Sequence, residues 1–158
     1  MRRKRLLSKI RGLILFFIIV LLVSGITVFP LEAELAWLSD HASMMPTGLG
    51  QWVQKCYIAF KETNVQYPMV GYGYDWLAFA HIIIALAYIG PFRDPVKNSW
   101  LIDWGLISCM AVVPLAFIAG TIRQVPLFHI LIDCSFGIIG IIPLWLCRKW
   151  IKKLGQIS

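Results

Sequence analysis

The chain has 158 residues, of which 59% are hydrophobic and only 15% are charged, and its formal net charge is +7 at pH 7. Soluble domains carry about 25% charged residues, so this composition excludes an ordinary soluble domain and indicates an all-α integral membrane protein. A basic excess in a soluble protein would suggest a nucleic-acid partner. In this chain, the positions of the basic residues relative to the apolar segments give a different explanation for the excess.

The first apolar segment covers residues 13–29 and follows a leader with six of the fifteen Lys and Arg residues. A helix rises about 1.5 Å per residue and needs about 20 apolar residues to cross a hydrocarbon core, so this segment predicts a transmembrane helix. A basic leader before an apolar stretch is also typical of a cleavable signal peptide. Because the apolar run continues to Phe29 without a small-x-small cleavage site, we favour an uncleaved anchor.

Residues 30–75 connect the first span to the second and predict a short helical lid. The stretch LEAELAWLSDHASMM (31–45) predicts one short helix. The stretch LGQWVQKCYIAFKE (49–62) places apolar residues at positions i, i+3, i+4, i+7 and i+11 from Leu49, which is the pattern of an amphipathic helix. We expect this second helix to lie on the membrane surface or to cap the transmembrane helices.

Three further apolar segments, residues 76–92, 100–120 and 125–146, predict the second, third and fourth spans. Short connections between antiparallel spans favour an up-and-down four-helix bundle, so residues 1–158 are expected to form a single membrane domain. Small and polar residues share faces of these spans, and we expect those faces to point into the bundle. Pro114 and Pro143 lie inside the third and fourth spans and predict kinks.

The basic residues are distributed unequally across the predicted membrane. Twelve of the fifteen lie in the leader, between spans two and three, or after span four, and only Lys55, Lys61 and Arg123 fall on the other side. The positive-inside rule therefore predicts a multi-pass protein of the cell inner (plasma) membrane, with both termini cytoplasmic and the lid extracytoplasmic. The basic tails serve topology and anionic lipid, so no nucleic-acid partner is expected.

Ionisable residues gather at the outer ends of the predicted spans. The candidate ligand-binding residues are His81, His129, Asp133, Arg123 and Asp75. Counted from the outer boundary, His81 lies about 9 Å deep and His129 about 6 Å deep, with Asp133 one turn deeper on the same face. Ionisable groups are costly in a membrane, so a polar pocket in the outer leaflet is predicted.

Four interpretations of this pocket remain open. His129 and Asp133 can pair with each other and only stabilise helix packing. The two imidazoles of His81 and His129 and the carboxylate of Asp133 are suitable ligands for a divalent metal such as zinc or iron. His81 and His129 could instead ligate haem b from facing helices. Finally, the cluster could recognise or move a small polar substrate or protons, with Arg123 holding an anion at the rim.

Several enzyme classes are excluded by the motifs. A disulfide-forming thiol oxidoreductase needs paired cysteines on the oxidising side, but only Cys56 is expected there and no CxxC occurs. No serine nucleophile motif or phosphate-cradling glycine loop is found. We therefore expect a binding, transport-associated or structural subunit and not an enzyme, with the lipid bilayer and either a membrane-protein partner or a second copy as partners. The alternative is a haem- or metal-binding membrane oxidoreductase that uses His81 and His129.

Overall fold

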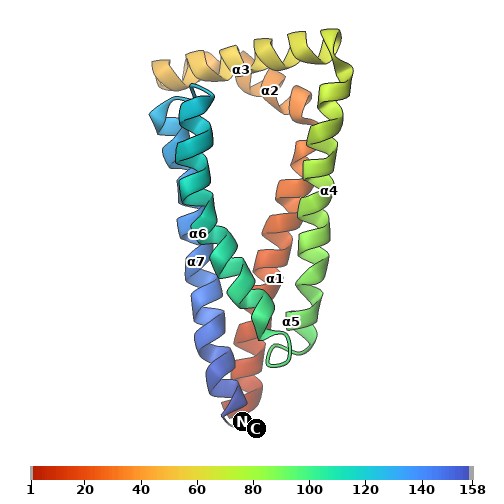
Figure 1. Cartoon of the computed structure of the whole chain (residues 1–158), viewed down its shortest axis with the longest axis vertical. Helices are drawn as coiled ribbons and strands as arrows, with labels where there is room; N and C mark the ends of the chain where they lie inside the picture. The colour runs from red at the N-terminus through yellow and green to blue at the C-terminus, as the bar shows by residue number, and fades with distance from the viewer. Residues whose placement is uncertain (1, 157–158) are drawn as a thin grey trace. The chain divides into compact units, whose positions relative to one another are not determined.

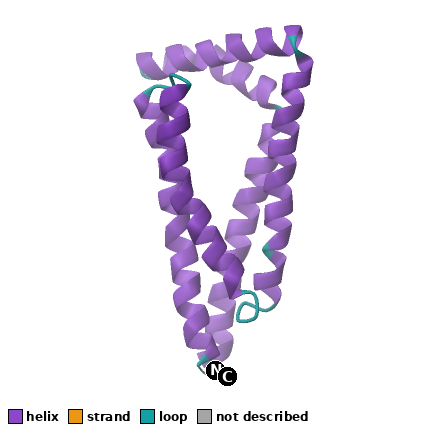
Figure 2. Ribbon diagram, viewed as in Figure 1, coloured by secondary structure: helices purple, strands orange, loops and turns teal. Residues whose placement is uncertain are grey.

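The computed structural model describes residues 2–156, and within that range every regular element is a helix (Figure 2). The long helices are α1 (Arg2–Val28), α3 (Thr47–Gln66), α4 (Gly71–Ala87), α6 (Ser99–Ile122) and α7 (Leu127–Gly155). The short ones are α2 (Leu31–Asp40), α5 (Ile89–Arg93) and the 3-10 turns η1 (Ala42–Met44) and η2 (Pro68–Val70). The prediction of an all-helical chain is confirmed.

Four helical segments are long and apolar enough to cross a membrane. They are Arg3–Val28, Pro68–Arg93, Ser99–Ile122 and Leu127–Gly155. Each contains nearly all of one predicted span, but α1 and α7 extend well beyond the apolar residues into the basic ends of the chain. Lys and Arg are good helix formers, so these helices continue after their apolar segments have ended.

The chain divides into two compact units, which we call the terminal unit (residues 1–18 and 87–158) and the central unit (residues 19–86). The terminal unit contains the first part of α1 together with α5, α6 and α7. The central unit contains the remainder of α1, then α2, α3 and nearly all of α4. Each unit has its own internal packing.

Within the terminal unit, α6 and α7 lie side by side (Figure 1). The buried residues of α7 recur at intervals of three, four or seven positions, as in a helix with one packed face: Ile130, Cys134, Gly137, Leu144, Cys147, Ile151 and Leu154. A Cβ added at Gly137 would lie 2.6 Å from the Cys109 carbonyl oxygen, and one at Gly140 would lie 2.9 Å from the Cys109 sulfur. The small residues therefore allow α7 to approach α6 closely, as predicted for this face.

The core of the terminal unit surrounds Tyr88, which follows α4 and has no exposed surface. Its ring contacts Phe17 of α1, with the ring centroids 4.8 Å apart. Its hydroxyl donates a long hydrogen bond of 3.4 Å to the Leu101 carbonyl and fills the space that Gly105 leaves on α6. Arg11 of α1 donates to the carbonyls of Phe92 and Arg93 at the end of α5, and so satisfies backbone groups that a helix end leaves unpaired.

Both predicted kink sites lie inside continuous helices. Pro114 is inside α6 and Pro143 is inside α7. Figure 1 shows that α6 changes direction partway along its length. A proline in a helix interior removes one backbone hydrogen bond and crowds the preceding turn, which accounts for such a bend.

In the central unit, the second part of α1 packs against α4. A Cβ added at Gly25 would lie 2.8 Å from the Ala78 carbonyl oxygen, so glycine is needed for this approach. The predicted helix at 31–45 is shorter than expected: α2 ends at Asp40 and is followed by η1. Met45 is extended because it precedes Pro46, and that restriction prevents α2 and α3 from joining.

Candidate functional site

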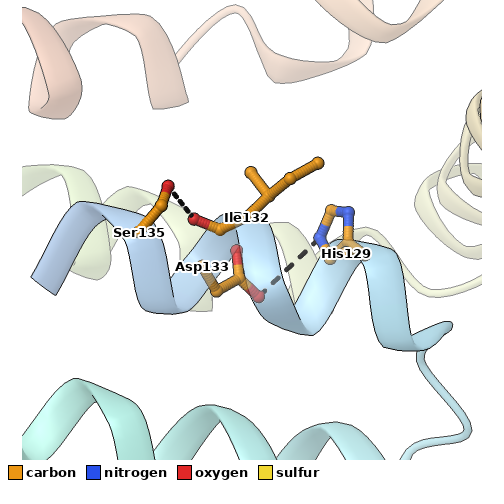
Figure 3. Close-up of polar contacts among 4 residues, drawn as sticks. All are labelled: His129, Ile132, Asp133 and Ser135. Carbon is orange, nitrogen blue, oxygen red and sulfur yellow. Dashed lines mark hydrogen bonds and ion pairs between the residues drawn. The ribbon is translucent and has the colours of Figure 1, made fainter. Parts of the chain in front are cut away.

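The first turns of α7 carry a His–Asp pair one helical turn apart (Figure 3). His129 Nε2 lies 3.9 Å from Asp133 Oδ2, and the two side chains are 40% and 45% exposed. The residues that follow them, Ile130 and Cys134, are buried at 4% and 5% exposure. The pair therefore lies at the edge of the packed face of α7 and not within it.

The geometry of this pair leaves the carboxylate open to further partners. A separation of 3.9 Å is longer than a hydrogen bond, so the contact is electrostatic. A carboxylate offers about four lone-pair positions, and one loose contact with an imidazole leaves most of them for other donors. The neighbouring Ser135 hydroxyl donates to the Ile132 carbonyl at 2.6 Å and is directed away from the pair (Figure 3), so it does not extend this polar site.

His81 belongs to α4 in the central unit, and a hydrogen bond within that helix orients its ring. Its Nδ1 lies 2.8 Å from the Leu77 carbonyl oxygen. A carbonyl oxygen only accepts hydrogen bonds, so Nδ1 is the donor, and in a neutral imidazole with this arrangement the lone pair is on Nε2. A histidine that ligates a metal or haem is typically oriented by this kind of second hydrogen bond. Ala78 and Ala85, on the same face of α4, are fully buried.

The five predicted site residues are divided between the two units. His129, Asp133 and Arg123 belong to the terminal unit, and His81 and Asp75 belong to the central unit. Arg123 is the exposed C-terminal cap of α6, where its backbone N–H donates to the Ala119 carbonyl. Asp75 lies in the first turns of α4 and lines a cavity of the central unit. The common pocket of all five residues remains a prediction.

The predicted metal site also remains a prediction. Within either unit, residues 2–156 include no group of three or more His, Cys, Asp and Glu side chains that could hold a metal ion. The predicted ligand set of His81, His129 and Asp133 draws on both units, and so it too remains a prediction.

The structure contains an ion pair that the sequence analysis missed. Arg148 Nε of α7 lies 2.6 Å from Asp103 Oδ1 of α6, and that carboxylate oxygen is buried. The sequence did contain a signal for this pair. Counted back along the two helices from their connection at residues 123–126, both residues lie about 20 positions, or about 30 Å, away. Opposite charges at matched heights on adjacent antiparallel helices predict a contact.

All four cysteines are free thiols, and Cys56 is the one that lies outside the long apolar helices. Burial raises the pKa of the Cys56 thiol above its ordinary value, and the charge of Lys55 lowers it by a smaller amount. A raised pKa means less thiolate at neutral pH, so Cys56 does not have the environment of a reactive cysteine.

Comparisons with known proteins provide no further assignment, because no protein-family model, no curated protein and no solved structure matches this chain.

Proposed function

We propose that this chain is a multi-pass protein of the cell inner (plasma) membrane, in which α1, α4, α6 and α7 cross the bilayer as an up-and-down bundle. Both ends are cytoplasmic, and α2 and α3 form the extracytoplasmic lid. The four long apolar helices and the twelve-to-three distribution of basic residues support this topology.

Within this topology, the protein is a binding or structural subunit whose polar site is built on His129 and Asp133. The observation that carries this proposal is the 3.9 Å contact between two ionisable, half-exposed side chains on a helix that is long and apolar enough to cross a membrane. A charge at the centre of a bilayer costs about 2.5–3.5 kcal/mol on translocon scales, so exposure of this pair to acyl chains is unfavourable. A polar ligand, a membrane-protein partner or a second copy that pairs with Asp133 removes this cost.

The experiment compares His129→Leu, Asp133→Leu and the double variant in detergent, measuring thermal stability together with bound metal, cofactor and co-purified protein. Each single variant should lower stability, because removing one partner leaves the other ionisable group uncompensated. The double variant should recover much of the stability but lose the bound species. Ser135→Ala is the matched control, since its hydroxyl is satisfied within α7. Small, additive stability changes with no loss of any bound species would contradict the proposal.

A second candidate function is a haem- or metal-binding oxidoreductase that uses His81 and His129. The Leu77 carbonyl favours it, because its hydrogen bond leaves the His81 Nε2 lone pair available for a ligand bond. The absorption spectrum and metal content of the purified protein test this candidate. Haem b predicts a Soret band that His81→Leu and His129→Leu each abolish, and a protein without band or metal contradicts it.

A further inference from the structure

The central unit contains a second polar site, separate from the His129–Asp133 pair. A cavity of about 330 Å³ lies among the end of α1, α2, the end of α3, η2 and the first turns of α4. Its size is at the lower end of the range of small-molecule sites, about 300–1,000 Å³. It is larger than a single dehydrated metal ion requires.

The lining of this cavity is acidic. Glu32 and Asp75 contribute two carboxylates, and Asn64 contributes an amide. Asn64 Nδ2 donates to Glu32 Oε2 at 2.6 Å, which fixes the Glu32 side chain and leaves its second oxygen for another partner. A ligand N–H that donates to these oxygens would form a charge-assisted hydrogen bond, which is stronger than a hydrogen bond between neutral groups.

No basic side chain of the central unit lines the cavity. Lys55 and Lys61 are the only Lys or Arg residues between positions 19 and 86. Lys61 Nζ lies 5.6 Å from the centre of the Tyr57 ring and Lys55 Nζ lies 5.9 Å from the centre of the Trp52 ring. Neither lysine is a lining residue, so within this unit the charge of the two carboxylates is not neutralised by a lysine at the cavity.

Aromatic rings make up much of the rest of the wall. Phe60 and Tyr74 both line the cavity, with ring centroids 5.3 Å apart and planes inclined by 55°. Tyr72 is a third lining ring. The negative faces of aromatic rings attract cations, and rings combined with carboxylates are the means by which proteins recognise ammonium groups.

We propose that this cavity binds the ammonium group of an organic amine. The carboxylates would provide charge and hydrogen-bond acceptors, and Phe60 and Tyr74 would surround the carbon-bound part of the cation. An anion would be repelled by Glu32 and Asp75. This site is independent of the proposed role of His129 and Asp133, and the two can fail separately.

Two sources can supply such an ammonium group. In the proposed topology the first turns of α4 lie at the outer membrane surface, where both a free amine and the headgroup of an aminophospholipid are within reach. The chemistry that recognises them is the same, so the experiment is arranged to distinguish the sources.

The experiment uses the full chain in phosphatidylglycerol nanodiscs, titrated in a calorimeter with methylammonium chloride, whose N–H groups can donate to the carboxylates, against sodium chloride at equal ionic strength. Saturable binding is expected. Glu32→Gln and Asp75→Asn should each weaken it about tenfold, the effect of losing about 1.4 kcal/mol. Glu32→Gln is a sharp test, because a glutamine oxygen can still accept the Asn64 hydrogen bond. Tyr74→Leu should weaken binding about three- to thirtyfold, whereas Tyr74→Phe should retain it.

The control variant is Glu34→Gln, which removes the same charge from α2 at a residue that does not line the cavity. Its affinity should match the unmodified protein, and the melting temperature of every variant without ligand reports whether it has folded. Weaker methylammonium binding in phosphatidylethanolamine discs would support the site and identify the lipid as occupant, while equal binding would support a free amine. Absence of saturable binding, or equal losses in Glu34→Gln and Asp75→Asn, would overturn the proposal.

Discussion

The contact between Gly105 and Tyr88 allows a quantitative test of the terminal unit. A Cβ added at Gly105 would overlap the Tyr88 hydroxyl oxygen and would lie 3.1 Å from Leu144 Cδ1. Tyr88 and Leu144 are both almost completely buried, so neither can move aside into open space. Overpacking of this kind costs about 1–3 kcal/mol of unfolding free energy. The better helix propensity of alanine returns about 1 kcal/mol, which leaves Gly105→Ala destabilised by about 0–2 kcal/mol.

A double-mutant cycle with Tyr88→Phe isolates the steric contribution. Removing the hydroxyl sacrifices only a 3.4 Å hydrogen bond, so Tyr88→Phe alone should cost about 0.5 kcal/mol, the low end of the range for hydrogen bonds. In the Gly105→Ala background the same change removes the overlapping atom. The double variant should therefore be more stable than the sum of the single variants predicts by about 1 kcal/mol, a coupling typical of residues in contact.

The assay is reversible unfolding in mixed micelles with increasing sodium dodecyl sulfate, followed by circular dichroism. Gly12→Ala is the matched control, because a Cβ added at Gly12 meets nothing within 4 Å and so reports the helix propensity alone. If Gly105→Ala is as stable as Gly12→Ala, or if Tyr88→Phe fails to relieve it, the packing around Tyr88 is not as described.

Three other predictions test topology, exposure and the ion pair. Two reporter enzymes are inserted at each position, one that is active only in the periplasm and one that is active only in the cytoplasm. At Asn64 the periplasmic reporter should be active, and at the C-terminal end the cytoplasmic reporter should be active; a periplasmic signal at the C-terminus would contradict the four-span topology. An impermeant maleimide should label Cys56 from outside but not the buried Cys134, and because burial raises the pKa of the Cys56 thiol, its labelling rate should still increase with pH above about 8.5. Asp103→Leu and Arg148→Leu should each lower the melting temperature more than the double variant does, since each single change leaves one charge uncompensated; a double variant that is the least stable of the three would refute this.

The parts of the fold that depend on local composition were predictable from the sequence. Apolar length predicted four helices long enough to cross a membrane. Of the face predicted for the second span, Ala78, Ala85 and Tyr88 are fully buried, but Tyr74 is 39% exposed. Helix ends were harder to predict, because hydropathy does not report the helix propensity of basic residues in α1 and α7. The break between α2 and α3 depends on the restriction that Pro46 places on the backbone of Met45, which periodicity does not contain.

The polar sites were less predictable, because they depend on contacts between distant segments. The spacing of His129 and Asp133 is local, and the structure places them within 4 Å of each other. The cavity of the central unit instead combines Glu32 of α2 with Asn64 of α3 and Asp75 of α4. Sequence analysis had grouped Asp75 with His81, His129, Asp133 and Arg123 as candidate ligand-binding residues and had not considered Glu32 as a site residue. No sequence pattern joins three helices in this way, so only the fold reveals the cavity.

The distribution of charge along the chain bears on both proposals. Thirteen basic and three acidic residues give the terminal unit a formal charge of +10, and two basic and five acidic residues give the central unit −3, which together make the +7 of the whole chain. In the proposed topology, the positive-inside rule would explain why basic residues are scarce between positions 19 and 86. It does not explain why acidic residues are frequent there, since Asp and Glu contribute little to membrane orientation. Two of those five acidic residues, Glu32 and Asp75, line one cavity together with three aromatic rings. The proposed cationic ligand would account for their placement, whereas the proposed topology alone would account only for the missing lysines and arginines.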